Sequence, residues 1–303
     1  MNKQELTSLV AEILSKMNSS QPQVKSSDYK TVVYNSDAPE NPPEPGEFVE
    51  DVTALDLRKL YMVESPKDEK AFRRLKERTP ARLGSGRAGP RYKTLTMLRF
   101  RADHAAAQDA VFSELPEDFG EKNGLVSVKT QCGDKDEYLT RPDKGRRFDE
   151  ENAAKIRSAI SGTPRVQLVI GDGLSSAAIA ANAMDCAAAI RDGLKVRGIE
   201  VGKGIFVKYC RVGAGDAVGD ITGCELVCVL VGERPGLVTD KSMSAYITYK
   251  PHTGVSESAR TVVSNIHAQG TPAVEAGAYV AELIETILKR KVSGVGLHLE
   301  AHG

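Results

Sequence analysis

The stretch VQLVIGDGLSSAAIAANA, residues 166–183, changes character at its centre. It opens on five residues dominated by aliphatic side chains, continues with Gly-Asp-Gly, and ends in small residues that suit a helix. An almost unbroken apolar run of this length is typical of a strand that is buried on both faces, as in a parallel sheet. The glycines permit a tight turn, and Ser175 can cap the helix that follows. The stretch therefore predicts a strand, a turn and a helix of an α/β domain.

Further β-rich runs and helical patterns alternate through the C-terminal half. Strands are expected at 166–170, 204–210, 225–231 and 245–250, and helices at 175–196, 214–223 and 272–291. This alternation predicts a mostly parallel sheet flanked by helices, a Rossmann-like α/β fold. Ligands of such sheets tend to bind at the carboxyl ends of the strands.

The chain divides into four expected segments. Residues 1–17 carry one apolar stripe at helical spacing and predict an amphipathic helix. Residues 18–50 are rich in proline and polar residues and predict a disordered linker. Residues 51–120 read as a smaller helical domain, and residues 121–303 as the α/β domain. The N-terminal helix packs back onto its own domain or oligomer, or it docks on a different partner.

Charge and cysteine usage exclude several classes of protein. Forty-one basic residues balance 41 acidic ones, so no overall charge draws the chain to nucleic acid or to a membrane. The segment 70–101 is locally basic, but it matches no nucleic-acid module, so we expect no nucleic-acid partner. Five cysteines without a CxxC pair indicate reduced thiols in a cytoplasmic protein. The apolar runs are too short to span a bilayer, and no secretory signal is present.

Three short motifs have a chemical and a structural interpretation each. GDGLSS (171–176) matches neither a nucleophile elbow nor a phosphate loop, so a tight turn with a helix cap is favoured over catalysis by Asp172 and Ser175. NIHAQG (265–270) has the outline of a corrinoid DxHxxG signature with asparagine in place of aspartate, or it is a polar turn ahead of a helix capped by Thr271. GERPG (232–236) follows a strand, where Glu233 contacts a ligand or forms a surface ion pair.

Several blocks together resemble the small subunit of ethanolamine ammonia-lyase. They are GRAGPR (86–91), LRFRADHAAAQDAV (98–111), YLTRPDKGRR (138–147), GDGLSS (171–176), VGERPG (231–236) and SNIHAQGTPAVEA (264–276). The likeness runs from about residue 52 to residue 292.

This resemblance implies a subunit of a radical enzyme that uses adenosylcobalamin to convert ethanolamine to acetaldehyde and ammonia. The substrate and the catalytic residues belong to the large subunit, a (β/α)8 barrel, and six heterodimers form one particle. A corrin ring is too broad for a barrel mouth to enclose alone, so the small subunit supplies a second wall. We accordingly expect no catalytic residue and no metal ligand in this chain.

The resemblance also implies the residues of that wall. The family's cofactor contacts fall on Val212, Glu233 and Val262, and family members have cysteine where this chain has Val262. Simple packing is the alternative for the two valines. The family's cofactor keeps its own benzimidazole on cobalt, so His267 is not expected to bind cobalt. Ethanolamine breakdown is commonly housed in a bacterial microcompartment, and residues 1–17 resemble the peptides that direct enzymes to its shell. The open alternative is a free-standing α/β hydrolase or nucleotide-binding protein that uses Asp172 and Ser175.

Overall fold

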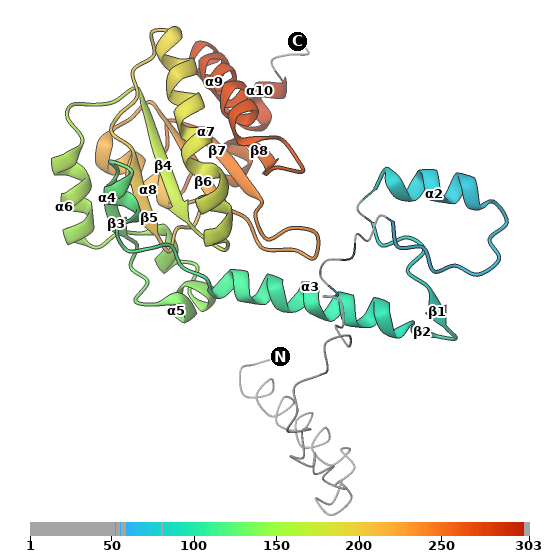
Figure 1. The fold of residues 1–303 in the computed structure, drawn as a ribbon. Coiled ribbons are helices and arrows are strands. Elements are labelled where there is room, and N and C mark those ends of the chain that lie inside the picture. Colours follow the sequence, from blue (N-terminus) through green and yellow to red (C-terminus); the bar gives the residue numbers. More distant parts are fainter. Residues whose placement is uncertain (1–51, 53–54, 56–58, 80, 300–303) are drawn as a thin grey trace, which may run out of the picture. The chain divides into compact units, whose positions relative to one another are not determined.

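The computed structural model describes residues 52, 55, 59–79 and 81–299 (Figure 1). The expected targeting helix and linker, residues 1–17 and 18–50, lie outside the described residues. The described residues belong to one compact unit. The expected boundary near residue 120, between a helical domain and an α/β domain, stays a prediction.

A six-stranded sheet lies at the centre of the described chain, with the order β3-β5-β4-β6-β7-β8. The first four strands in this order are parallel, and β7 and β8 join them in antiparallel fashion. The mostly parallel α/β fold is therefore confirmed, although β3 and β8 were not expected. The strands are β3 (Val126–Lys129), β4 (Val166–Asp172), β5 (Ile205–Lys208), β6 (Leu226–Gly232), β7 (Met243–Tyr249) and β8 (Arg260–Ile266).

Helices flank this sheet, and α7, α8 and α9 lie close to the positions that the sequence predicts. Ser175 caps α7 by accepting a hydrogen bond from the Ala178 N–H, and Gly223 ends α8 in a left-handed conformation with φ of 68°. The helices are α4 (Phe119–Lys122), α5 (Lys135–Thr140), α6 (Glu150–Ala159), α7 (Ser176–Val196), α8 (Ala214–Thr222), α9 (Ala273–Arg290) and α10 (Val295–Leu299), with 3-10 turns at Lys144–Arg146 and Glu257–Ala259.

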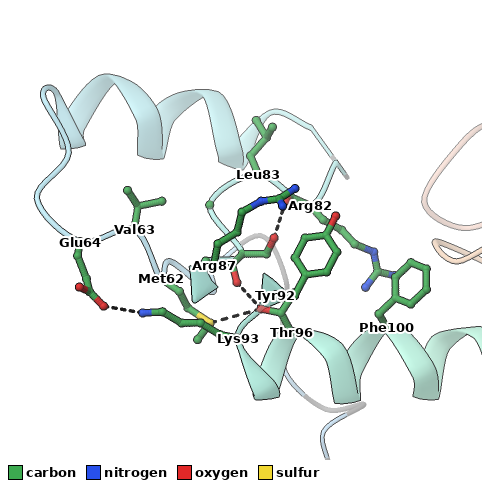
Figure 2. A pocket seen from close by; sticks show the side chains of 13 residues that line it. Met62, Val63, Glu64, Arg82, Leu83, Arg87, Tyr92, Lys93, Thr96 and Phe100 are labelled. Atoms are coloured by element: carbon green, nitrogen blue, oxygen red, sulfur yellow. Dashed lines mark hydrogen bonds and ion pairs between the residues drawn. The ribbon is translucent and has the colours of Figure 1, made fainter. Parts of the chain in front are cut away.

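The segment before the sheet consists of two helices and a small hairpin. Helix α2 (Glu69–Glu77) precedes β1 (Arg87–Ala88) and β2 (Arg91–Tyr92), which pair and lead into the long helix α3 (Thr94–Phe112). A hollow of about 600 Å³ lies between the start of α3 and residues 62–64 and 82–87 (Figure 2).

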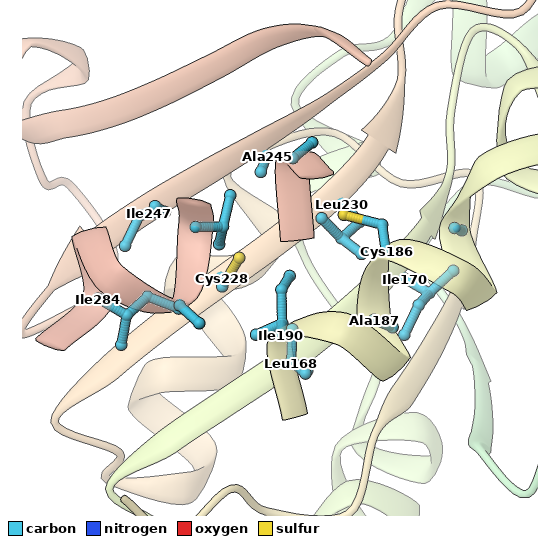
Figure 3. Close-up of a cluster of buried hydrophobic side chains, with 14 of the residues drawn as sticks. Leu168, Ile170, Cys186, Ala187, Ile190, Cys228, Leu230, Ala245, Ile247 and Ile284 are labelled. Atoms are coloured by element: carbon cyan, nitrogen blue, oxygen red, sulfur yellow. The ribbon is translucent and has the colours of Figure 1, made fainter. Parts of the chain in front are cut away.

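The two faces of the sheet are covered by different helices. On one face, called the α7 face, α7 and α9 pack over Leu168, Ile170, Leu230 and Ile247 (Figure 3). The opposite face, called the α8 face, packs against α6 and α8. Its side chains belong to the strand residues that alternate with those of the α7 face, among them Val169, Val207, Val227 and Val229. Burying each such side chain stabilises the fold by about 1.5–3 kcal/mol.

All five cysteines are free and buried. Burial raises the pKa of Cys186 to about 12, and it also raises the pKa of Cys210 and Cys228. Thiols in such surroundings are unreactive at neutral pH. None of the described helices combines the length and the apolar character that a membrane crossing requires.

Candidate functional site

The ends of β4 and β5 are where a doubly wound sheet commonly holds a ligand, because the helices that follow them lie on opposite faces. In this chain α5 occupies that position. Tyr138 is buried and donates a hydrogen bond to the Cys210 carbonyl at 3.1 Å, and Lys135 Nζ donates to the Gly173 carbonyl at 3.1 Å. The Arg211 guanidinium lies 4.3 Å from the centre of the Tyr138 ring. The crevice at this point is therefore filled by the protein itself.

GDGLSS forms a structural turn beside α5. Ser175 is fully buried, and its hydroxyl accepts from the Ala178 N–H at 3.0 Å while donating to the Asp240 carbonyl at 2.5 Å. Asp172 accepts from the Ser176 hydroxyl at 2.7 Å, and burial raises the pKa of its carboxyl group. A Cβ at Gly171 would lie 2.6 Å from Cys210 Sγ, so the turn needs glycine there. Both candidate catalytic side chains thus serve the turn and the helix start.

NIHAQG is also a self-contained turn. His267 is 7% exposed, and its Nδ1 accepts from the Gln269 N–H at 3.2 Å, so its Nε2 carries the proton donated to Asn265 Oδ1 at 2.8 Å. Both ring nitrogens are engaged within the turn. The expected cap was wrong, because α9 begins at Ala273 with Pro272 at the N-cap position and Thr271 hydrogen-bonds back to Asn265. Within the described chain, no group of histidine, cysteine and acidic side chains is arranged to hold a metal ion.

The three expected cofactor contacts lie on the α8 face of the sheet. Val212 sits in the turn between β5 and α8 and packs against the cluster of that face. Glu233 follows β6 directly, and its N–H donates to the Ser242 carbonyl at 2.9 Å. Val262 lies on the edge strand β8, where its side chain is 46% exposed. Val212 and Glu233 occupy carboxyl ends of strands, as the sequence predicts, whereas Val262 lies within a strand.

Tyr246 on β7 connects two of these residues. It pairs directly with Val262 across the β7–β8 ladder, and its hydroxyl donates to Glu233 Oε1 at 2.8 Å. Its ring packs against the same cluster as Val212. Burial and the hydrogen bond to Glu233 raise the pKa of Tyr246, so the phenol stays protonated and remains a donor.

Sequence reasoning missed Tyr246. The alternation in AYITYK offered a signal, since it sets Tyr246 and Thr248 on the face opposite to Ala245 and Ile247. The run nevertheless predicts only a strand, because the sequence does not show that Glu233, which follows β6, is the partner of Tyr246. Among the described residues, Glu233 is bonded to this tyrosine instead of forming the surface ion pair that was the alternative.

A buried ion pair anchors the edge strand that carries Val262. Arg260, at the start of β8, forms a bidentate pair with Asp216 of α8, with both distances at 2.7 Å. It also donates to Thr248 Oγ1 at 3.2 Å and to Glu257 at 2.8 Å. These contacts hold the start of β8 against α8, while Val262, two residues further along the strand, is left exposed on the α8 face.

The resulting surface suits binding more than covalent chemistry. It combines an exposed aliphatic side chain, a half-buried aromatic ring and a carboxylate whose orientation Tyr246 fixes. A carboxylate accepts hydrogen bonds through two oxygens, and here only Oε1 is used by the described residues. The other oxygen is available to an N–H donor of a ligand.

Comparisons with known proteins agree with the sequence resemblance. Residues 69–298 match the family model described as ethanolamine ammonia-lyase light chain (EutC). The chain is similar to the ethanolamine ammonia-lyase small subunit of Clostridium perfringens, with 54% identity over 98% of this chain and 100% of the relative. Similar proteins of the same name occur in Clostridioides difficile, with 58% identity over 82% of this chain and 85% of the relative, and in Listeria monocytogenes, with 50% identity over 98% and 100%. This chain therefore belongs to the family of ethanolamine ammonia-lyase small subunits.

Proposed function

We propose that this chain completes the cofactor site of a heteromeric, adenosylcobalamin-dependent carbon–nitrogen lyase that converts ethanolamine to acetaldehyde and ammonia. A large subunit carries the substrate and the catalytic residues, and six heterodimers form the particle. The small subunit is required for activity, although it contributes no reacting group.

The arrangement of Glu233, Tyr246 and Val262 carries this proposal. Adenosylcobalamin is a broad ring with apolar edges and peripheral amide side chains. Val262 and Val212 fit the apolar edge, and the unused oxygen of Glu233 fits an amide N–H donor. Tyr246 keeps the carboxylate in place because its hydroxyl donates to Oε1 at 2.8 Å. Val212, Glu233 and Val262 therefore fit the edge of adenosylcobalamin.

The role of this chain follows from what these side chains can do. When bound, adenosylcobalamin supplies the radical chemistry by which the amino group migrates. Val212 and Val262 exclude water from their side of the site, and Glu233 orients the amide that it accepts from. Water exclusion matters because a carbon radical is quenched by stray hydrogen donors.

Ammonia release from ethanolamine tests the proposal. We expect activity when this chain is co-expressed with the large subunit, and none from either chain alone. Glu233→Gln should raise the cofactor concentration for half-maximal rate about tenfold, because a charge-assisted hydrogen bond contributes about 1.5–3 kcal/mol. Glu282→Gln, on an exposed site of α9, is the matched control and should change nothing. Full activity of the large subunit alone, or a Glu233→Gln variant that behaves like the control, would contradict the proposal.

The hydrolase and nucleotide-binding alternative has less support. Its two residues, Asp172 and Ser175, are buried and hydrogen-bonded to their own turn, and α5 fills the crevice beside them. For RNA binding, segment 70–101 has three aromatic residues, but each ring contacts a neighbouring side chain: Phe72 packs on Tyr61, and Arg82 and Arg87 lie over Phe100 and Tyr92.

We further propose that residues 1–17 direct the enzyme to a bacterial microcompartment in the cytoplasm. The support is their apolar stripe, Leu6, Leu9, Val10, Ile13, Leu14 and Met17, ahead of a proline-rich segment. Deletion of residues 1–17 should leave ammonia release intact and abolish co-sedimentation with shells. Unchanged co-sedimentation would rule this role out.

A further inference from the structure

Helix α3 carries several large apolar side chains that the described part of the chain leaves largely uncovered. Of its 19 residues, only Thr96 and Ala110 are buried. Leu98 is 50% exposed, Phe100 41% and Phe112 59%. Apolar side chains that are exposed in this way gain free energy when a partner removes them from water. The described residues of this chain do not supply that cover.

Helix α3 is held to the sheet at one end. The Ser176 hydroxyl lies 2.7 Å from the Ser113 carbonyl, directly after the helix, and shares its one hydrogen between this carbonyl and Asp172 Oδ1. Arg82 adds a second connection by bonding to Asp103 at 2.6 Å and to the Leu237 carbonyl at 3.0 Å. These contacts connect α3 to the start of α7 at one end and, through Arg82, to the turn at Leu237.

One side of α3 lines two hollows. Thr96 and Phe100 line the hollow of about 600 Å³ in Figure 2, and His104 and Val111 line a second of about 330 Å³. Residues 234–237, the turn after Glu233, form the opposite wall of the second hollow. The exposed apolar surface of α3 is thus continuous with the turn that carries the proposed cofactor contact.

The surface around α3 is strongly basic. Residues 59–112 contain 13 Lys and Arg against 6 Asp and Glu, which gives +7 in a chain whose overall net charge is +0. Arg91 and Arg101 are exposed, and the described part of the chain offers no ion-pair partner to either. An apolar and basic surface fits a partner that is apolar and acidic.

We propose that this region, termed the α3 surface and made of the exposed side chains of residues 59–79 and 81–112, is the docking surface for the large subunit. The inference rests on the proposed function. A large subunit that covers the cofactor beside Glu233 would also cover residues 234–237 and, next to them, α3. A second copy of this chain is a poorer occupant. Two copies related by a two-fold axis would bring the same +7 segments together.

Co-purification with the large subunit tests the inference. The full chain is co-expressed with an affinity-tagged large subunit, and the captured amount is compared between Leu98→Glu and Val196→Glu. Val196 is 87% exposed at the end of α7, so the control places the same charge on a helix away from the α3 surface. We expect Leu98→Glu to reduce capture at least about tenfold, since a buried charge at an interface centre is strongly unfavourable. Val196→Glu should be captured like the wild type.

A second variant guards against misfolding. Arg101→Glu reverses an exposed charge, should leave the thermal unfolding of the chain unchanged, and should weaken capture most at low salt. Equal capture of all variants would overturn this inference and would leave the proposed function standing. So would self-association of the isolated chain that Leu98→Glu abolishes while capture persists, because the occupant would then be a second copy. If the wild-type chain does not capture the large subunit, the proposed function fails first, and the inference fails with it.

Discussion

The two faces of the sheet are equally apolar at its centre, but they differ at β7 and β8. On the α7 face, Ala245 and Ile247 are fully buried beneath α7 and α9. On the α8 face, their neighbour Tyr246 is half-buried and Val262 is 46% exposed. The α7 face is thus closed and stabilises the fold, whereas the α8 face is open where the proposed cofactor contacts lie.

The difference follows from how the strands are connected. Parallel strands need crossover helices, and these helices supply the cover for the faces of β3 to β6. Antiparallel strands need only short connections, so the passage from β6 through β7 to β8 adds no α-helix to the α8 face. The long helices α7 and α9, with 21 and 18 residues, both lie on the other side. A change from parallel to antiparallel pairing thereby leaves a flat, accessible surface on a fold that otherwise covers both faces.

The largest expected effect comes from detaching β8 from α8. Arg260→Met leaves Asp216 buried without its partner, and we expect the free energy of unfolding to fall by about 3–5 kcal/mol. The combination of Arg260→Met with Asp216→Leu should recover most of that loss, since no buried charge then remains. Urea unfolding of the three proteins measures both effects. Equal stability of the single variant and the wild type would show that the open face does not depend on this ion pair.

The same substitution on each face gives the next largest difference. Val280→Ala on α9, at a fully buried site of the α7 face, should lower the free energy of unfolding by about 2–3 kcal/mol. Val262→Ala on the open face should change it by less than about 0.5 kcal/mol. Chemical denaturation of both variants measures the contrast. Similar losses at the two sites would mean that Val262 is as well packed as the core.

Removing a helix cap should have a smaller effect. Ser175→Ala deletes the acceptor for the Ala178 N–H, and we expect a loss of about 1 kcal/mol in the free energy of unfolding. Ammonia release by the assembled enzyme should be unchanged, because the hydroxyl serves α7. Thermal unfolding and the activity assay are run on the same preparation. A stable but inactive variant would restore the catalytic interpretation of GDGLSS.

The parts of this fold that the sequence predicts are those whose signal is local. The runs at 166–170 and 225–231 are buried on both faces, so they remain apolar along their whole length and identify a parallel sheet. Strand β8 escaped prediction because only one face is covered, and because Asn265, with φ of 63°, and a register shift interrupt its pattern. Strand β3 is only four residues long.

The candidate site shows the same limit. The resemblance placed Val212, Glu233 and Val262, and strand ends predicted the location of the first two. The contact between Tyr246 on β7 and Glu233 directly after β6 joins residues 13 positions apart, and it depends on antiparallel pairing that no motif encodes. Likewise, the position of α5 over the ends of β4 and β5 depends on the hydrogen bond from Tyr138 to the Cys210 carbonyl, 72 residues further along the chain.

The smallest expected change in stability offers the sharpest test of the open face. Val262→Cys should be nearly neutral for folding, and it places a thiol on an exposed edge strand. A thiol reagent at mildly alkaline pH should label this cysteine quickly, because an exposed thiol keeps its ordinary pKa. The five native cysteines should react only on unfolding, since all of them are buried and their pKa values are raised.

Labelling then reports on what covers the open face. The large subunit together with adenosylcobalamin should slow the labelling of Val262→Cys by at least about tenfold, because a thiol enclosed at a buried contact is inaccessible. Val196→Cys, at a site that is 87% exposed on α7, should label at one rate in the free and the assembled states. Protection of Val262→Cys by the large subunit alone would assign this surface to the protein partner. Protection that appears only with the cofactor would assign it to the corrin, and labelling at the free rate in the complete complex would remove Val262 from the site.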